Sequence, residues 1–176
     1  MMRFLVVCLL VLCSMPAFAS ITDYVVKQWN IQNGLPSQSL KSIAQDEQGY
    51  MWLGTQFGLS RFDGNTFTNF NTQNSDFLPS NGINKLLVDS TGLLWVGTKN
   101  GIVTLDPRTM MSQTFNVKGP VRDILEDSKG SIWIAANGLY YVARNQVTLN
   151  QNSALVVPVS NATAITQIVG SVSQMA

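Results

Sequence analysis

DEQGYMWLGT at residues 46–55 recurs as DSTGLLWVGT at residues 89–98 and, with more changes, as DSKGSIWIAA at residues 127–136. The tryptophans of these stretches lie 43 residues apart (52 to 95) and then 38 residues apart (95 to 133). A period of about 40 residues with one Trp and one turn Gly per unit is typical of β-propeller blades, solenoids and similar arrays. Because the units are alike, the repeated positions hold no unique catalytic constellation. The positions that define the repeat are Asp46, Gly49, Trp52, Gly54, Asp89, Gly92, Trp95, Gly97, Asp127, Gly130 and Trp133.

Each repeat is predicted to form four short strands joined by turns. In the first repeat the strand-like segments are residues 39–45, 50–55, 59–62 and 66–70. Asp63-Gly64-Asn65 favours a tight hairpin between the last two, because Asp-Gly supplies the positive φ angles of a type I′ turn. Four strands in about 35 residues make one propeller blade. The predicted fold is therefore all-β, with three four-stranded blades plus partial units in an incomplete propeller.

A partial unit is predicted on each side of the three blades. Residues 24–29 occupy the place of a lone fourth strand, which in propellers completes a last blade built from the C-terminus. Residues 164–169 resemble a first strand, yet propellers close with about four to eight blades. We therefore expect this chain to be the N-terminal part of something longer. The predicted segments are a signal peptide (1–19), a closing strand and lead-in (20–34), blade 1 (35–77), blade 2 (78–118), blade 3 (119–153) and the start of a possible fourth blade (154–176).

The N-terminal residues have the layout of a bacterial secretory signal peptide. A basic start at Arg3 precedes the apolar run 4–12, and Ala17-Phe18-Ala19 forms an A-x-A cleavage site before Ser20. We expect cleavage after Ala19 and export to the periplasm. Lipidation at Cys13 is the less favoured alternative, because Leu12 precedes it where a lipoprotein signal has a small residue. Both cysteines, Cys8 and Cys13, lie in the segment to be removed, so the mature chain would rely on packing without disulfides.

The charges exclude several classes of function. Loss of Arg3 would leave 11 − 1 = 10 basic residues against 10 acidic ones, which does not suggest capture of nucleic acid or anionic lipid. The chain has no histidine, so it carries no phosphoacceptor His, no Ser-His-Asp triad and no His-based zinc site. The Asp-x-x-Gly turns are better explained by Asp capping its own turn than by calcium. We predict no metal, no cofactor and no catalytic residue.

The three tryptophans and the loops offer candidate binding groups. The Trp residues are predicted to fill the wedges between blades rather than to stack on a sugar or a base, since repeated positions usually serve packing between units. Loops between second and third strands share a propeller face with the links between blades, and ligands commonly approach there. Ordinary solvated loops are the alternative. The candidate ligand-binding residues are Gln56, Phe57, Lys99, Asn100 and Asn137 in these loops, with Lys41 and Arg122 on the innermost strands.

Asp-x-x-Gly-x-ϕ-Trp-ϕ-Gly-Thr (ϕ apolar), followed by Gly-Leu and Asp-Gly, resembles the two-component regulator propeller repeat. The lead-in at residues 29–36 is similar to the opening of such sensors after their signal peptide. The resemblance covers residues 24 to about 142 and is weaker in the third unit, where Ala135-Ala136 replaces Gly-Thr. Quinoprotein propeller repeats match residues 89–95 but usually lack the Gly97-Thr98 that follows here.

The resemblance implies the periplasmic sensing region of a larger inner-membrane protein whose output is a histidine kinase or a diguanylate cyclase. We therefore expect a non-catalytic, ligand-binding sensor module that stops before any output domain. The alternatives are part of an exported propeller enzyme, quinoprotein- or lyase-like, and a stand-alone interaction propeller. Expected partners are an unidentified small molecule or saccharide and further blades of the same or another chain, but not nucleic acid. With open blade faces, the 176 residues are not expected to form a stable monomer.

Overall fold

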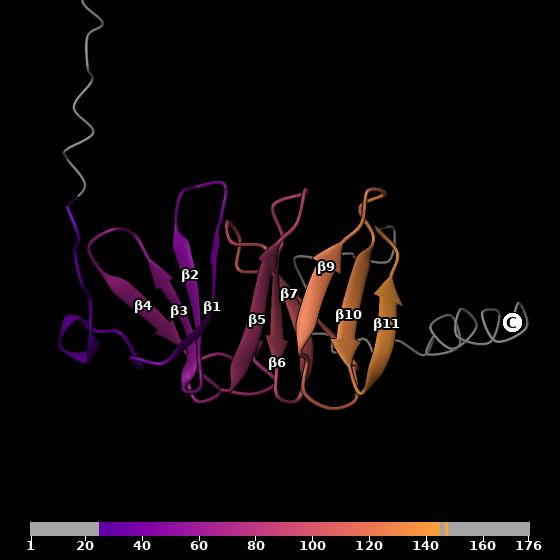
Figure 1. Ribbon diagram of the computed structural model, residues 1–176, viewed down its shortest axis with the longest axis horizontal. Coiled ribbons are helices and arrows are strands. Elements are labelled where there is room, and N and C mark those ends of the chain that lie inside the picture. The colour runs from indigo at the N-terminus through magenta and orange to yellow at the C-terminus, as the bar shows by residue number, and fades with distance from the viewer. Residues whose placement is uncertain (1–24, 145–146, 148–176) are drawn as a thin grey trace, which may run out of the picture.

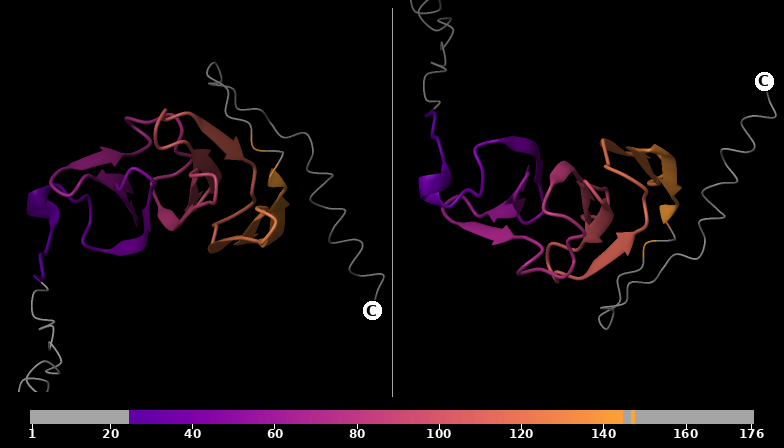
Figure 2. Two further views of the ribbon diagram at one scale, coloured as in Figure 1. Left: turned by 90° about the horizontal axis from the view of Figure 1, so that it is seen from above. Right: turned by 90° about the horizontal axis from the view of Figure 1, so that it is seen from below.

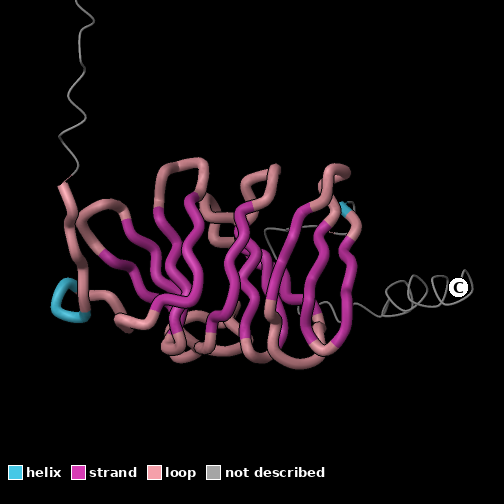
Figure 3. The backbone as a smooth tube through the Cα atoms, viewed as in Figure 1, coloured by secondary structure: helices cyan, strands magenta, loops and turns pink. Residues whose placement is uncertain are grey.

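The computed structural model describes residues 25–144 and 147, which form three consecutive antiparallel sheets (Figure 1). Strands and their turns make up nearly all of the described part, and Figure 3 shows a single short helical turn ahead of them, η1 (Ile31–Asn33). The predictions for the signal peptide, for Tyr24 and for the segment 154–176 concern residues outside the described ones. In the described part of the chain, no helix has the length and apolar character needed to cross a bilayer.

Each sheet is one repeat of the sequence, which confirms the all-β prediction. Within a sheet, sequential strands pair with their neighbours in order, as in a propeller blade. The third sheet contains three strands within the described residues. The first sheet contains β1 (Leu40–Gln45), β2 (Met51–Thr55), β3 (Gly58–Phe62) and β4 (Phe67–Phe70); the second contains β5 (Ile83–Val88), β6 (Leu94–Thr98), β7 (Gly101–Leu105) and β8 (Ser112–Phe115); the third contains β9 (Asp123–Glu126), β10 (Ile132–Ala136) and β11 (Gly138–Val142).

A carboxylate closes the turn between the first and second strands of every blade, at what we call the turn end of the molecule (top of Figure 1). Oδ1 of Asp46 accepts hydrogen bonds from the backbone N–H groups of Gln48 (3.0 Å) and Tyr50 (2.9 Å). Gly49 completes the turn with a φ of 88°, which a side chain would make unfavourable. The predicted Asp-capped turn is thus confirmed, and it recurs at Asp89 with Gly92 and at Asp127 with Gly130.

The second oxygen of the same carboxylate binds the tryptophan of its blade. Nε1 of Trp52 donates to Oδ2 of Asp46 at 2.8 Å. A buried indole N–H needs an acceptor, and Trp52 is completely buried. The sequence predicted the turn and the packing role of the Trp, but not this bond between them. The equivalent distances are 2.7 Å from Trp95 to Asp89 and 2.9 Å from Trp133 to Asp127.

The connection between β3 and β4 differs from the predicted type I′ hairpin. Gly64 has a positive φ of 99°, but Asp63 does not, so one of the two left-handed residues expected from Asp-Gly in a type I′ turn is missing. The strands instead join through the four residues 63–66. Oδ1 of Asp63 accepts the N–H groups of Asn65 (2.7 Å) and Thr66 (2.6 Å), and this capping satisfies the backbone of a wider loop.

Blades pack because a glycine on one blade leaves room for a side chain of the next. A Cβ placed on Gly54 would lie 2.7 Å from Cγ2 of Ile83, and one on Gly97 would lie 2.5 Å from Cγ1 of Val121. Both neighbours are completely buried, Ile83 at the start of β5 and Val121 just before β9, so they have little freedom to move. The second glycine of each motif therefore permits the close approach of the following blade.

Two apolar cores lie between the three blades. Trp52 and Leu59 of blade 1 pack against residues of β5, β6 and β7, and Trp95 and Ile102 of blade 2 pack against β9, β10 and β11. The prediction that the tryptophans fill the wedges between blades is confirmed for Trp52 and Trp95, both of which are completely buried. The sheets follow one another along an arc (Figure 2).

Residues 25–30 lie beside blade 1 but form no strand. The sequence placed a fourth strand here, and a strand requires neighbours to pair with, which the described residues do not supply. The segment is held by side chains instead, since the ring of Trp29 lies edge-on to Phe62 at 5.1 Å. Leu35, just after η1, packs with Leu53 and Phe62 in a third apolar cluster.

Replacement of Gly97 by alanine tests the packing between blades. The new Cβ would collide with Val121, so we expect a loss of about 1–3 kcal/mol in the free energy of unfolding, as for an overpacked core. The measurement is a urea titration followed by Trp fluorescence. The matched control is Ala135→Gly, which alters the same motif position on the outer face of blade 3. A Gly97→Ala midpoint equal to that of the unmodified chain would contradict this packing.

Candidate functional site

The seven candidate ligand-binding residues all lie at the end of the strands opposite the Asp turns, which we call the link end (bottom of Figure 1). Strands alternate in direction, so the β2–β3 turns and the links between blades meet at this end, as predicted. The start of β1 belongs here too, because Leu40 pairs with Thr55. Every candidate is solvent-exposed: Lys41, Gln56, Phe57, Lys99, Asn100, Arg122 and Asn137.

The link between blades 1 and 2 is bound to the β6–β7 turn through Lys99. The backbone N–H of Lys99 donates to the carbonyl of Gly82 at 2.9 Å. The methylene groups of the same side chain cover Gly82, where a Cβ would lie 2.6 Å from Cδ of Lys99. Link 71–82 and the turn at residues 99–100 therefore form one continuous surface.

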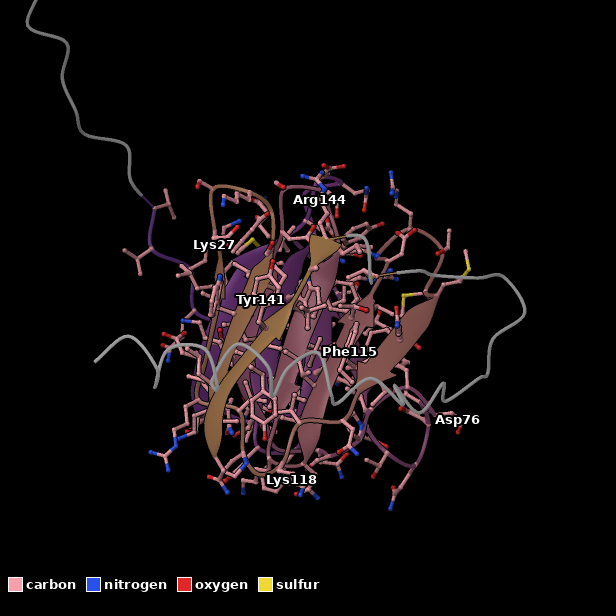
Figure 4. The ribbon with its side chains drawn as sticks, turned by 90° about the vertical axis from the view of Figure 1, so that its right-hand side faces the viewer. Lys27, Asp76, Phe115, Lys118, Tyr141 and Arg144 are labelled. Carbon is pink, nitrogen blue, oxygen red and sulfur yellow. The ribbon has the colours of Figure 1, made fainter. Side chains whose placement is uncertain are left out.

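The link between blades 2 and 3 is bound in a similar way. The amide side chain of Asn137 packs over Gly119, and the hydroxyl of Tyr140 accepts the N–H of Lys118 at 3.3 Å. Sequence reasoning singled out Asn137 but missed Lys118 and Tyr140, because neither lies in the repeated motif. Figure 4 shows Lys118 and Asp76, one from each link, at the same end of the molecule, with Arg144 at the other end.

The threonine of the Gly-Thr pair holds the turns of the first two blades. Oγ1 of Thr98 donates to the carbonyl of Gly101 (2.9 Å) and accepts the N–H of Asn100 (3.0 Å). Thr55 makes the same two bonds, to Gly58 and Phe57. The third blade has Ala136 at this position, which has no hydroxyl group to hold the turn. Its turn is shorter by one residue, so the candidate Asn137 is the single residue between β10 and β11.

The first strands of blades 1 and 2 each begin with a bulge, and the candidate Lys41 lies at the first of them. The β1–β2 register shifts at Lys41, and the β5–β6 register shifts at Asn84. An extra residue at a bulge changes the direction of its side chain. Nδ2 of Asn84 donates across the blade junction to the carbonyl of Val121 at 3.0 Å, whereas the aligned Lys41 and Arg122 are exposed cations.

Charge is distributed unevenly between the two ends. The turn end carries most of the acidic groups, whereas the link end carries four exposed cations besides Lys85, with Asp76 and Asp123 as the acidic residues there among those described. Several turn-end carboxylates are already bound to turn N–H groups, while the link-end cations remain on the surface. The link-end cations are Lys41, Lys99, Lys118 and Arg122, and the turn-end acids are Asp46, Glu47, Asp63, Asp89, Asp106, Glu126 and Asp127.

One ion pair joins blades 2 and 3 near the link end. Nζ of Lys85 lies 2.8 Å from Oδ1 of Asp123. This hydrogen bond, followed by one from the N–H of Ile124, holds the pKa of Asp123 below its ordinary value. Both side chains are well exposed, so the pair adds little stability. It links the first strand of blade 2 to the first strand of blade 3.

A cavity of about 340 Å³ opens at the turn end between blades 2 and 3. Its lining includes Asp89, Trp95, Gly130 and Arg144. The carboxylate of Asp89 is already engaged by the indole and by the turn, so it has little capacity to bind a ligand. This cavity was not predicted from the sequence, because most of its lining belongs to the repeated Asp turns and the strands that follow them.

Comparison with known proteins assigns the repeats. The family model for the two-component regulator propeller matches residues 34–57, 78–100 and 117–138, one segment per blade. These three units are two-component regulator propeller repeats. The matches begin near the link before each blade and end in the β2–β3 turn, so they include the Asp turn and the Trp.

Related proteins are much longer than this chain. The extracellular domain of a hybrid two-component system from B. thetaiotaomicron is 26% identical with a TM-score of 0.61, over 69% of this chain and 18% of that one. Histidine kinase P4 of Formosa agariphila is 36% identical over 55 residues, which are 31% of this chain and 4% of that protein. A streptogramin B lyase matches with a TM-score of 0.50 and 19% identity, over 65% of this chain and 40% of that one, a likeness of fold alone.

Replacement of Lys85 by methionine tests the junction at the link end. The ammonium group is the main cause of the low pKa of Asp123, so this pKa should rise toward its ordinary value of 3.8, measured by NMR titration of the carboxyl carbon. Because the pKa is lowered in the folded chain, the stability that Asp123 adds is present above the unfolded pKa and is lost as pH falls through the folded one. Lys85→Met should shrink this acid-dependent contribution.

The control group in the same titration is Asp127. The indole of Trp133 and the N–H of Ser131 hold its pKa low without help from Lys85. An unchanged pKa of Asp123 in Lys85→Met, or an equal shift at both carboxyls, would show that the ion pair is absent in solution.

Proposed function

We propose that this chain is a non-catalytic sensor module, a set of propeller blades that binds a ligand and reports it to a signalling output. The observation that carries the proposal is the match of all three blades to the two-component regulator propeller. The likeness to the extracellular domain of a hybrid two-component system supports it further. The structure contributes a framework of Asp turns and packed tryptophans that is repeated in the blades, with a polar surface at the link end.

The link end is the proposed ligand-binding surface. Its turns and links are attached to one another through Lys99 and Gly82, and through Asn137 and Gly119, so a ligand there would contact adjacent blades at once. The excess of cations at this end favours an anionic ligand. An acidic saccharide combines that charge with hydroxyl groups for the exposed Asn100 and Gln56.

The proposed location is the periplasm. The A-x-A site before Ser20 supports export and cleavage of residues 1–19, and the related domains are extracellular. In the proposed arrangement the blades belong to a protein anchored in the inner membrane, with a histidine kinase or a diguanylate cyclase as its output. Mass spectrometry of exported material tests cleavage directly, since the mature chain would begin at Ser20; an intact Met1 would contradict it.

An exported propeller enzyme is the second candidate, because streptogramin B lyase shares the fold. The described blades use the carboxylates of Asp46 and Asp89 to hold turns and indoles, which leaves these groups unsuited to acid–base catalysis. A stand-alone interaction propeller is the third candidate. Sequencing the DNA that follows the codon for Ala176 distinguishes these candidate functions. Further repeats followed in frame by a kinase or a cyclase would support the sensor.

A thermal-shift comparison tests the proposed surface. The probes are glucose with glucuronate and galactose with galacturonate, each pair differing in one carboxylate. We expect the acidic members to raise the melting temperature and the neutral members to have less effect. Lys99→Ala and Arg122→Ala should each reduce the shift severalfold, because each removes a link-end cation. The matched control is Lys129→Ala, which removes a cation from the turn end.

If the acidic probes raise the melting temperature equally in Lys99→Ala, Arg122→Ala and Lys129→Ala, then Lys99 and Arg122 do not belong to the binding site. The absence of a shift with any acidic probe would contradict the proposed ligand class while leaving the family assignment intact.

A further inference from the structure

An asparagine followed directly by glycine occurs four times in this chain, as Asn33-Gly34, Asn81-Gly82, Asn100-Gly101 and Asn137-Gly138. Asparagine is one of the chemically labile side chains of proteins. A following glycine has no Cβ to keep its backbone nitrogen away from the amide carbon of the asparagine. All four pairs belong to the described residues, so the groups that hold each of them can be compared.

The first pair is held by hydrogen bonds at both groups that would have to react. Oδ1 of Asn33 accepts the N–H of Asn30 at 3.0 Å. The N–H of Gly34 donates to the carbonyl of Ile31 at 3.0 Å. The amide and the nitrogen that would attack it are therefore both engaged.

The second pair is held in the same way, within the link between blades 1 and 2. Oδ1 of Asn81 accepts the N–H of Thr72 at 2.7 Å. The N–H of Gly82 donates to Oγ of Ser80 at 3.2 Å. Attack on the Asn81 amide would require both bonds to break, so this pair is also protected.

The fourth pair is restrained by packing. A Cβ placed on Gly119 would lie 2.4 Å from Nδ2 of Asn137 and 2.7 Å from its Cγ. The amide carbon thus rests on the link between blades 2 and 3. This link would have to move before the carbon could turn toward the nitrogen of Gly138.

The third pair has the least restrained side chain. Asn100 is exposed in the turn between β6 and β7, and its amide makes no hydrogen bond to another described residue. Gly101 pairs with Thr98 at the end of both strands, where local opening costs least. The remaining restraint is the hydroxyl of Thr98, which accepts the N–H of Asn100 and donates to the carbonyl of Gly101.

We propose that Asn100 is a site of spontaneous deamidation, which converts it to aspartate or isoaspartate. The nitrogen of Gly101 loses its proton to the solvent and attacks Cγ of Asn100. A cyclic succinimide forms as the Cγ–Nδ2 bond breaks and ammonia leaves. Water then opens the ring, either at Cγ to give aspartate or at the backbone carbonyl carbon to give isoaspartate. One water is consumed for each ammonia released, and no group is oxidised or reduced.

The reaction adds a carboxylate to the link end. The new charge would stand beside Lys99, at the end of the described blades where cations outnumber acidic residues. The modification itself does not depend on the proposed function, whereas its effect on binding rests on it. If the link end binds an anionic ligand, a carboxylate at position 100 weakens that binding as the protein ages.

Peptide mapping by mass spectrometry in heavy-oxygen water tests the site. The full chain is kept in mildly alkaline buffer, either folded or in urea, and conversion is followed at all four pairs. In the folded chain Asn100 should convert about tenfold faster than Asn33 and Asn81, the ratio that corresponds to one hydrogen bond at the strong end of the usual net range. In urea the four rates should become similar.

Two results of this experiment would overturn the proposal. One is faster conversion in the folded chain at Asn33, Asn81 or Asn137 than at Asn100. The other is an unchanged Asn100 in the folded chain after the urea sample has converted.

Thr98→Val tests the restraint on the turn. The change removes the hydroxyl that holds both sides of the Asn100–Gly101 peptide, so conversion of Asn100 should become severalfold faster. The matched control is Thr55→Val, which removes the same two bonds from a turn without asparagine and should leave the rate at Asn100 unchanged. An unchanged rate in Thr98→Val, or an equal acceleration at Asn33 and Asn81, would contradict a local restraint.

Asn100→Asp tests the consequence for binding. The thermal shift with glucuronate should be severalfold smaller in Asn100→Asp than in the original chain, and Asn100→Gln, which adds no charge, should retain it. Equal shifts in the two variants would overturn the proposed effect on binding. If glucuronate shifts none of the three proteins, the proposed ligand class fails while the mapping result decides the deamidation site by itself.

Discussion

The architecture depends on the hydrogen bond from each tryptophan indole to the aspartate six residues earlier in its blade. One carboxylate does two things: Oδ1 organises the turn at Asp46, and Oδ2 fixes the ring of Trp52. The bond is charge-assisted and its donor is buried, so loss of the acceptor would strand an indole N–H in the core. The turn and the wedge between blades are therefore one unit, repeated three times.

The position of the tryptophan determines how the next blade packs. The indole forms one wall of the core between blades, and the glycine two residues later provides the gap into which the next first strand fits. The indole contacts lie toward the turn end, and the glycine contacts lie near the link end but involve buried apolar groups. The exposed side chains of the link-end turns take no part in these contacts, so one framework can present different polar surfaces there. The charges at the link end are thus a property of this chain rather than of the repeat.

Much of this framework could be predicted because the repeat marks it three times. The period, the turn glycines and the wedge tryptophans were readable from spacing alone, and the structure confirms them. The indole–carboxylate bond was not, because six residues of separation carry no pattern until the turn geometry is known. The wider loop at residues 63–66 shows that Asp-Gly also suits a capped four-residue turn.

The link end was predictable in position but not in detail. Strand order places the candidate residues there, yet the contacts of Lys99 with Gly82 and of Tyr140 with Lys118 join segments outside the motif. Residues 24–29 were assigned to a strand from their place in the repeat. Residues 25–30 are instead attached to blade 1 by the contact of Trp29 with Phe62, which the repeat pattern does not predict.

The most direct test is a double-mutant cycle on the second blade, with Asp89→Ala, Trp95→Phe and both together, followed by urea unfolding. The turn bonds of Asp89 are lost equally in the single and double variants, so their contribution cancels and the cycle isolates the bond to the indole. The structure predicts a coupling of about 1.5–3 kcal/mol, the range for a hydrogen bond to a charged group. A coupling near zero would show that turn and wedge are independent and would contradict the account.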